Sequence, residues 1–222
     1  MEETIRQIAV WALPLLVAVV FHELAHGWVA NRLGDPTAAR LGRLSLNPLA
    51  HIDLFGSILI PLTLILSHSP FVFGWAKPVP VNFNNLRHPK RDMVWVALAG
   101  PVMNLLLALG FTIAWKALVP LAVGPQGEAR SGVTSLLAPM VLMVQNGILI
   151  NIALAVFNLL PLPPLDGGRV AVGLLPQPLS SKLAGIERFG MLTLIVLLYT
   201  RMLDQVIDVP TEILLKLYLG LF

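Results

Sequence analysis

The sequence of residues 21–27 is Phe-His-Glu-Leu-Ala-His-Gly, and it lies inside a long apolar run. No charged residue occurs at positions 8–21, and the apolar pattern continues for several residues beyond the two histidines. In a helix, His22 and His26 are four residues apart and lie on one face, so both imidazoles can reach a single metal ion. Glu23 lies beside the first histidine, where it can accept a proton from a water molecule at the metal.

This run is long enough to cross a membrane. Residues 5–33 make a helix that exceeds the hydrocarbon thickness of about 30 Å. His26 and His22 precede Arg32 by six and ten residues, which places a metal roughly 9 to 15 Å inside the basic end of the helix. Ionisable groups are costly at this depth, so we expect them to have a function. The motif therefore predicts water chemistry below the membrane surface.

The composition indicates a multi-pass integral membrane protein. The protein has 222 residues, of which 56% are hydrophobic and 12% charged, with a mean hydropathy of +0.80. A soluble domain would carry about 25% charged residues. The basic residues occur in short loops between apolar runs, which is a topology signal, so we expect no nucleic-acid partner. No loop could fold alone, and we expect one membrane-embedded domain over residues 1–222.

The apolar runs predict an all-α polytopic fold with about four transmembrane helices, at residues 5–33, 93–119, 136–160 and 189–202. A shorter run at 54–66, interrupted by Gly56 and Pro61, predicts a re-entrant segment. A full crossing at 54–70 is the alternative.

Two further segments have weaker patterns. Residues 73–82 contain prolines and predict a short membrane-associated strand segment, with an extended backbone and edge-strand character. The tail, residues 206–222, is short and interrupted, and it predicts a C-terminal interfacial helix.

A catalytic zinc ion takes three protein ligands and keeps one position open. The sequence has no cysteine, so the third ligand must be another His, Asp or Glu. Asp166 is favoured because it follows a proline-rich turn at the end of a span and precedes two glycines. Asp53 is the competing candidate. We interpret His51, His68 and His88 as loop histidines outside the site.

Two motifs together resemble the site-2 protease family of zinc intramembrane metalloproteases. The first is H-E-x-x-H at residues 22–26, and the second is N-x-x-P-x-x-P-x-D-G at residues 158–167. Residues 99–104, Ala-Gly-Pro-Val-Met-Asn, resemble the family's G-P-x-x-N element. The resemblance covers about residues 5–175 and implies a compact member, without the PDZ or CBS domain of many relatives.

The resemblance implies a zinc-dependent intramembrane endopeptidase with one Zn²⁺ per molecule. Its ligands would be His22, His26 and Asp166, with Glu23 as the general base. Asn158 would hold the substrate or stabilise the oxyanion. Substrate-binding positions would include Asn104 and four residues of the extended segment, namely Gly74, Trp75, Val79 and Val81. An unwound substrate could pair with that segment by β-augmentation.

Charge distribution predicts the orientation. The loops 31–52, 71–92 and 161–188 carry most of the Lys and Arg, so the positive-inside rule places them in the cytoplasm and both termini outside. We therefore expect a plasma or inner membrane protein whose active site lies nearer the cytoplasmic face. Its expected partners are a transmembrane protein substrate and the lipid bilayer, and a homo-oligomer is possible.

Two other function classes compete with the protease. A catalytically inactive scaffold or metal-binding regulator could keep the same fold, but a pure binder has no need of Glu23. A transporter could also use embedded polar residues and broken helices, but no inverted repeat is visible.

Overall fold

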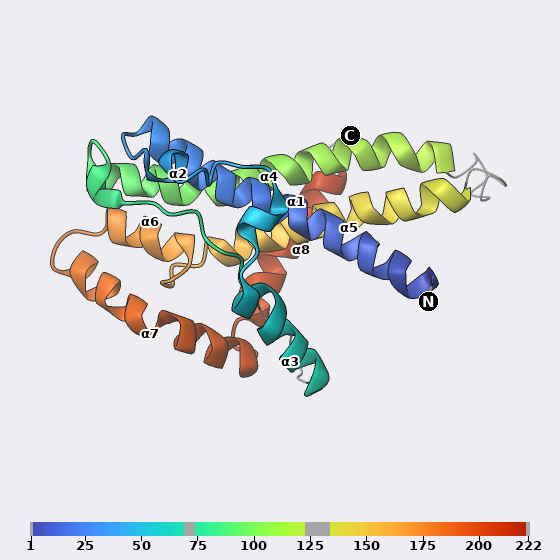
Figure 1. Ribbon diagram of the computed structural model, residues 1–222. Coiled ribbons are helices and arrows are strands. Elements are labelled where there is room, and N and C mark those ends of the chain that lie inside the picture. The colour runs from blue at the N-terminus through green and yellow to red at the C-terminus, as the bar shows by residue number, and fades with distance from the viewer. Residues whose placement is uncertain (1, 69–73, 123–133, 221–222) are drawn as a thin grey trace.

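The computed structural model describes residues 2–68, 74–122 and 134–220. Within those ranges the protein is helical, with no strand, which confirms the all-α expectation (Figure 1). The described residues contain eight α-helices: α1 Glu2–Arg32, α2 Thr37–Arg40, α3 Ile60–Leu66, α4 Pro89–Ala122, α5 Thr134–Asn158, α6 Asp166–Leu174, α7 Leu179–Tyr199 and α8 Asp204–Gly220. Short turns of other helix types lie at Pro48–His51, Leu54–Leu59 and Phe83–Asn85.

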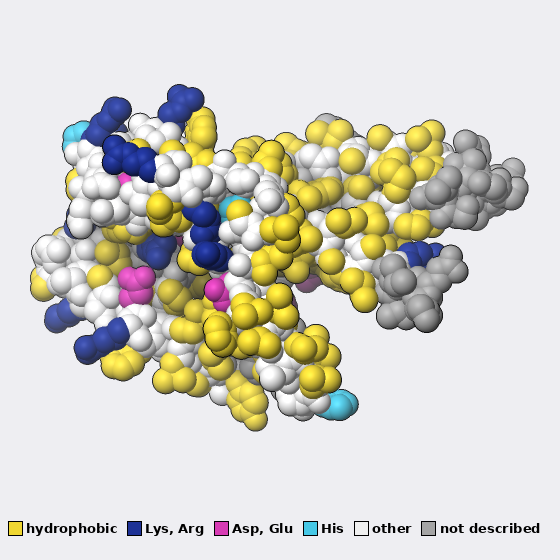
Figure 2. Space-filling view, viewed as in Figure 1, with side chains coloured by type: hydrophobic (Ala, Val, Ile, Leu, Met, Phe, Trp, Pro, Cys, Tyr) yellow, Lys and Arg dark blue, Asp and Glu magenta, His cyan; other side chains and the backbone are white. Residues whose placement is uncertain are grey.

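Three of these helices are long and apolar enough to cross a membrane. They cover Arg6–Arg32 in α1, Pro89–Ala122 in α4 and Leu137–Asn158 in α5. Figure 2 shows hydrophobic side chains spread over α1, α4 and α5, while most of the Lys and Arg side chains in view gather at the opposite end. An apolar surface of this extent suits lipid rather than water. The protein is an integral membrane protein.

Helix α4 organises the bundle. It packs against α1, α5 and α6, and α1 also packs against α5. A small apolar core forms where α4 and α5 meet, from Ala108, Ile148, Ile152 and Val156. Helices α1 and α6, which carry His22 and Asp166, therefore both lie against α4.

The fourth predicted span is a bent pair of helices. Taken together, α7 and α8 are long and apolar enough to cross a membrane, but the chain bends by 80° between them. The tail forms a helix as expected, α8 at Asp204–Gly220, and this helix also packs against the bundle. Side chains of α8 pack on the α4–α5 core, and the Tyr218 hydroxyl donates to the Leu105 carbonyl at 3.1 Å.

The apolar segment at 54–66 leaves the body of the protein, and the backbone then comes back. Its helix, α3, projects from the rest of the bundle (Figure 1). The Trp75 amide donates to the Gly56 carbonyl at 3.0 Å, so the backbone returns to the point where it left. Arg43 donates to the Lys77 carbonyl at 3.1 Å. The rival full crossing would separate these groups, and the structure favours the re-entrant path, although residues 69–73 lie outside the described ranges.

Residues 74–82 form neither helix nor strand. A strand needs a partner for its amide and carbonyl groups, and among the described residues this segment has no partner strand. Its amides bond elsewhere, as that of Val79 does to Glu23 and that of Lys77 to the His51 carbonyl. The predicted strand is therefore an unpaired segment along α1.

A buried carboxylate that the sequence analysis missed anchors this segment. Asp35 is fully buried and accepts hydrogen bonds from the Thr37 hydroxyl, the Thr37 amide at 3.1 Å, the Asn82 amide at 2.7 Å and Asn85 Nδ2 at 2.9 Å. Burial alone would raise the pKa of Asp35, but these bonds hold that pKa below its usual range. The Asp-Pro-Thr sequence after α1 is the local signal for such a turn.

Candidate metal centre

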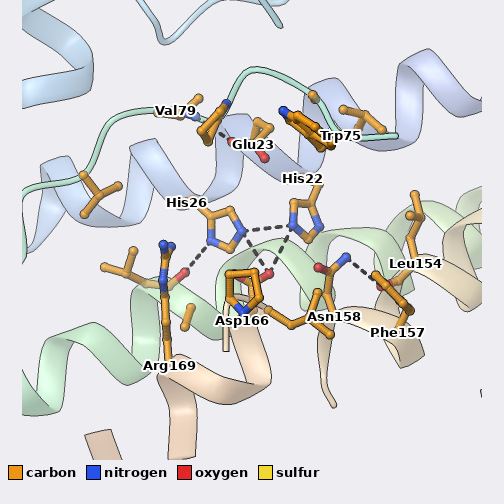
Figure 3. Close-up of a pocket in the computed structure, with 18 of the residues that line it drawn as sticks. His22, Glu23, His26, Trp75, Val79, Leu154, Phe157, Asn158, Asp166 and Arg169 are labelled. Atoms are coloured by element: carbon orange, nitrogen blue, oxygen red, sulfur yellow. Dashed lines mark hydrogen bonds and ion pairs between the residues drawn. The ribbon is translucent and has the colours of Figure 1, made fainter. Parts of the chain in front are cut away.

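His22 and His26 lie one helical turn apart on α1 and face the same cavity (Figure 3). Their ring centroids are 4.6 Å apart and the rings are nearly perpendicular. Their Nε2 atoms are separated by 3.0 Å. The spacing of the motif therefore brings two ligand atoms together without help from any other element.

Helix α4 orients both rings through their other nitrogen. His26 Nδ1 donates to the Val96 carbonyl at 2.7 Å, and His22 Nδ1 donates to Asn104 Oδ1 at 2.5 Å. The Asn104 amide is held in turn, because its Nδ2 donates to the Ala18 carbonyl and to Asn151 Oδ1. These bonds place the proton of each imidazole on Nδ1 and leave the Nε2 lone pair facing the cavity.

Asp166 brings the third candidate ligand atom. It is the first residue of α6, is 7% exposed, and its Oδ2 lies 3.2 Å from both Nε2 atoms. Gly167 and Gly168 permit this position, because a Cβ on either would lie 2.2–2.3 Å from backbone atoms of Leu159 or Pro163. The two glycines let the proline-rich turn fold back over the start of α6.

The donor set fits a zinc ion. Asp166 Oδ2 is buried and has no hydrogen-bond donor, and it faces two nitrogen lone pairs. Such a group of acceptors repels itself unless a cation lies among them. Zinc bonds of about 2.0–2.1 Å require tetrahedral ligand atoms to lie roughly 3.3 Å apart, close to the distances observed. Of the described residues, only His22, His26 and Asp166 form such a cluster.

The competing ligand, Asp53, lies elsewhere. Its carboxylate accepts from the Gly56 amide at 2.7 Å and caps the turn at Leu54–Leu59. The other histidines lie outside the cavity as well, and His51 is buried in a loop with its Nε2 donating to the Ser45 carbonyl at 2.8 Å.

Gly100 allows α4 to approach the two histidines. A Cβ at this position would lie 2.4 Å from His26 Nε2 and 2.6 Å from His22 Nε2. This glycine was not among the site residues predicted from the sequence. The signal was the Ala-Gly-Pro sequence inside a span, since small residues mark close helix contacts.

Glu23 points away from Asp166 and toward the extended segment (Figure 3). Its Oε2 accepts from the Val79 amide at 2.7 Å. The cavity that it shares with the three ligands has a volume of about 350 Å³. The cavity wall includes the predicted substrate-contacting residues Asn158, Gly74, Trp75, Val79 and Val81.

Two predicted contacts differ in detail. Asn104 is fully buried behind His22 and is not among the residues that line the cavity. Its side chain orients the His22 ring and does not reach the place where a substrate would lie. Asn158 does line the cavity, and its Nδ2 donates to the Leu154 carbonyl at 2.9 Å. One amide hydrogen of Asn158 is therefore used within its own helix, and the other is available to the cavity.

Arg169 also lines the cavity and was missed from the sequence. It lies three residues after Asp166 in α6, and residues three apart share a helix face. That spacing could have identified it once Asp166 was chosen.

In comparison with known proteins, the sequence matches a peptidase family and proteins named as zinc metalloproteases. The family model "Peptidase family M50" matches residues 10–198. The sequence is 38% identical over 213 residues to a Bacillus subtilis protein named "Putative zinc metalloprotease YwhC", covering 94% of this protein and 90% of that one. It is 31% identical over 195 residues to "Putative zinc metalloprotease Rip2" of Mycolicibacterium smegmatis, covering 86% and 66%. No solved structure matches it.

Proposed function

This protein belongs to peptidase family M50, and on that premise we propose that it is a zinc-dependent intramembrane endopeptidase. Its substrates would be peptide bonds within or near the transmembrane segments of other proteins. One observation carries the proposal: three ligand atoms converge beside a carboxylate, in a cavity whose walls include apolar spanning helices. A zinc ion held by His22, His26 and Asp166 would polarise a peptide carbonyl and lower the pKa of water.

Glu23 supplies the base. It follows His22 on α1 and lines the same cavity, so a water molecule at the ligand cluster lies within its reach. The Val79 amide fixes one carboxylate oxygen at 2.7 Å, which leaves the other free to accept a proton. The same carboxylate then returns that proton to the leaving amine. A scaffold that only binds metal would have no use for this group.

Asn158 and the extended segment position the substrate. The free amide hydrogen of Asn158 can donate to the oxygen on which negative charge develops, and one such donor contributes a few kcal/mol. Gly74, Trp75, Val79 and Val81 line the cavity, and Figure 3 shows Trp75 and Val79 on the side opposite Asp166. A peptide bond inside a helix is sheltered by its hydrogen bonds, so the substrate must unwind before it lies along this segment.

The test uses purified protein, zinc and a fluorogenic model substrate that contains one transmembrane helix. We expect wild type to cleave it and lose activity to a chelator. Glu23→Gln should keep the metal and lose most hydrolysis, because glutamine cannot accept the proton. Asp166→Asn should bind zinc more weakly, whereas the matched control Asp53→Asn should bind it normally. Normal turnover in Glu23→Gln would refute the mechanism, and normal zinc binding in Asp166→Asn would refute the ligand set.

A further inference from the structure

Arg169 carries a positive charge on the wall of the cavity. Of the described residues that line the cavity, it alone has a lysine or arginine side chain. Its guanidinium lies 5.5 Å from the ring centroid of Phe83, another cavity residue, and this contact holds the charge at the wall. A substrate that enters the cavity therefore meets a positive charge at this wall.

The two carboxylates of the cavity do not pair with Arg169. Asp166 faces the two histidines, and Glu23 accepts from the Val79 amide. Arg169 has an ion pair with Glu187 of α7, at 3.6 Å, with 40% of the arginine side chain and 48% of the glutamate side chain exposed. Exposed ion pairs contribute little to stability, so a substrate group could displace Glu187 at little cost.

The position of Arg169 limits where that group would lie. Three residues along α6 correspond to about 4.5 Å of helix axis from Asp166. An extended substrate advances about 3.3 Å per residue, so the group would belong to a residue within about two positions of the cleaved bond. α6 runs from Asp166 toward the start of α4, where Lys90 Nζ donates to the Leu175 carbonyl at 2.5 Å.

We propose that Arg169 determines specificity by binding a substrate carboxylate within about two residues of the cleaved bond. This inference rests on the proposed endopeptidase function and names its substrate class. The planar guanidinium offers paired donors that match a carboxylate. The carboxylate can come from an aspartate or glutamate side chain or from the C-terminus of the substrate, and both present the same two oxygens.

The experiment compares substrates that differ at one position. The cut in a neutral model substrate is mapped first, and each position within two residues of it is then replaced by Glu, Gln or Lys. For wild type we expect kcat/KM to be about tenfold higher for Glu than for its isostere Gln at one position, with Lys the poorest. Arg169→Gln should bring the ratio of Glu to Gln close to one. Arg169→Glu should prefer Lys over Glu.

The matched control is Glu187→Gln, which removes the present partner of Arg169 and leaves the arginine in place. It should keep or increase the preference for Glu. Loss of the preference in this control would refute the proposal, because it would show that the ion pair and not the free guanidinium matters. The inverted preference of Arg169→Glu tests the charge even if Arg169→Gln folds poorly.

A second pair of substrates separates the two carboxylate sources. One ends two residues beyond the cut as a free acid, and the other ends there as an amide. A preference for internal Glu indicates side-chain recognition, and a preference confined to the free acid indicates recognition of a C-terminus. Equal cleavage of all neutral and acidic substrates overturns the role of Arg169 alone. Failure of wild type to cleave any substrate overturns the proposed function instead.

Discussion

Replacing Gly100 by alanine should disable the metal centre without touching a ligand. The added Cβ would lie 2.4 Å from His26 Nε2 and 2.6 Å from His22 Nε2, whereas ordinary contact begins at 3.4 Å. These groups must therefore separate by about 1 Å. The tolerance of a metal site is about 0.2 Å in each ligand distance, so the displacement is roughly five times too large.

We expect Gly100→Ala to weaken zinc binding by at least the 10- to 100-fold typical of lost supporting contacts. The same overpacking should lower the free energy of unfolding by about 1–3 kcal/mol. Zinc affinity is measured by competition with a chelator in detergent, and stability by thermal unfolding with excess chelator. The metal-free comparison separates the effect on folding from the effect on zinc.

Gly110→Ala provides the matched control. Gly110 lies in the same helix, and a Cβ there would meet nothing within 4 Å. Alanine is favoured over glycine inside a helix by about 1 kcal/mol, so this variant should bind zinc normally and be no less stable. Wild-type zinc affinity in Gly100→Ala would refute the reasoning, because it would show that α4 can retreat from the histidines at no cost.

Three further predictions concern other parts of the molecule. Asn104→Ala should weaken zinc binding about 10- to 100-fold through loss of His22 orientation, with metal content and Glu23-dependent turnover as readouts. Because the folded pKa of Asp35 lies below its unfolded value of about 3.9, its contribution to stability is present above that pH and is lost as pH falls through the folded pKa. The gap in melting temperature between wild type and Asp35→Asn should therefore shrink below about pH 4, and a constant gap from pH 7 to 3 would contradict this. Single cysteines at positions 40, 87 and 126 should label with an impermeant thiol reagent in intact cells only at 126, and labelling at 87 with protection at 40 would exclude the re-entrant path.

Local periodicity was enough to predict that the two histidines of the site lie together. His22 and His26 share a helix face because their spacing is close to one helical turn, and that geometry needs no other part of the protein. Hydropathy likewise predicted the spans that α1, α4 and α5 form, because the cost of exposing polar groups to lipid is local. Asp166 was predicted from its proline and glycine neighbours together with the family motif.

Contacts between distant segments needed the tertiary structure. The tautomer of His26 depends on Val96, 70 positions away, and that of His22 depends on Asn104, 82 positions away. Glu23 likewise meets the Val79 amide 56 positions later. No local pattern encodes such pairs, because they depend on how whole helices pack. The same reason explains why α8 lies across the core, and why the cavity includes Arg169. The sequence by itself determined the spans and the candidate metal ligands, and packing decided how each of these side chains is oriented and what surrounds it.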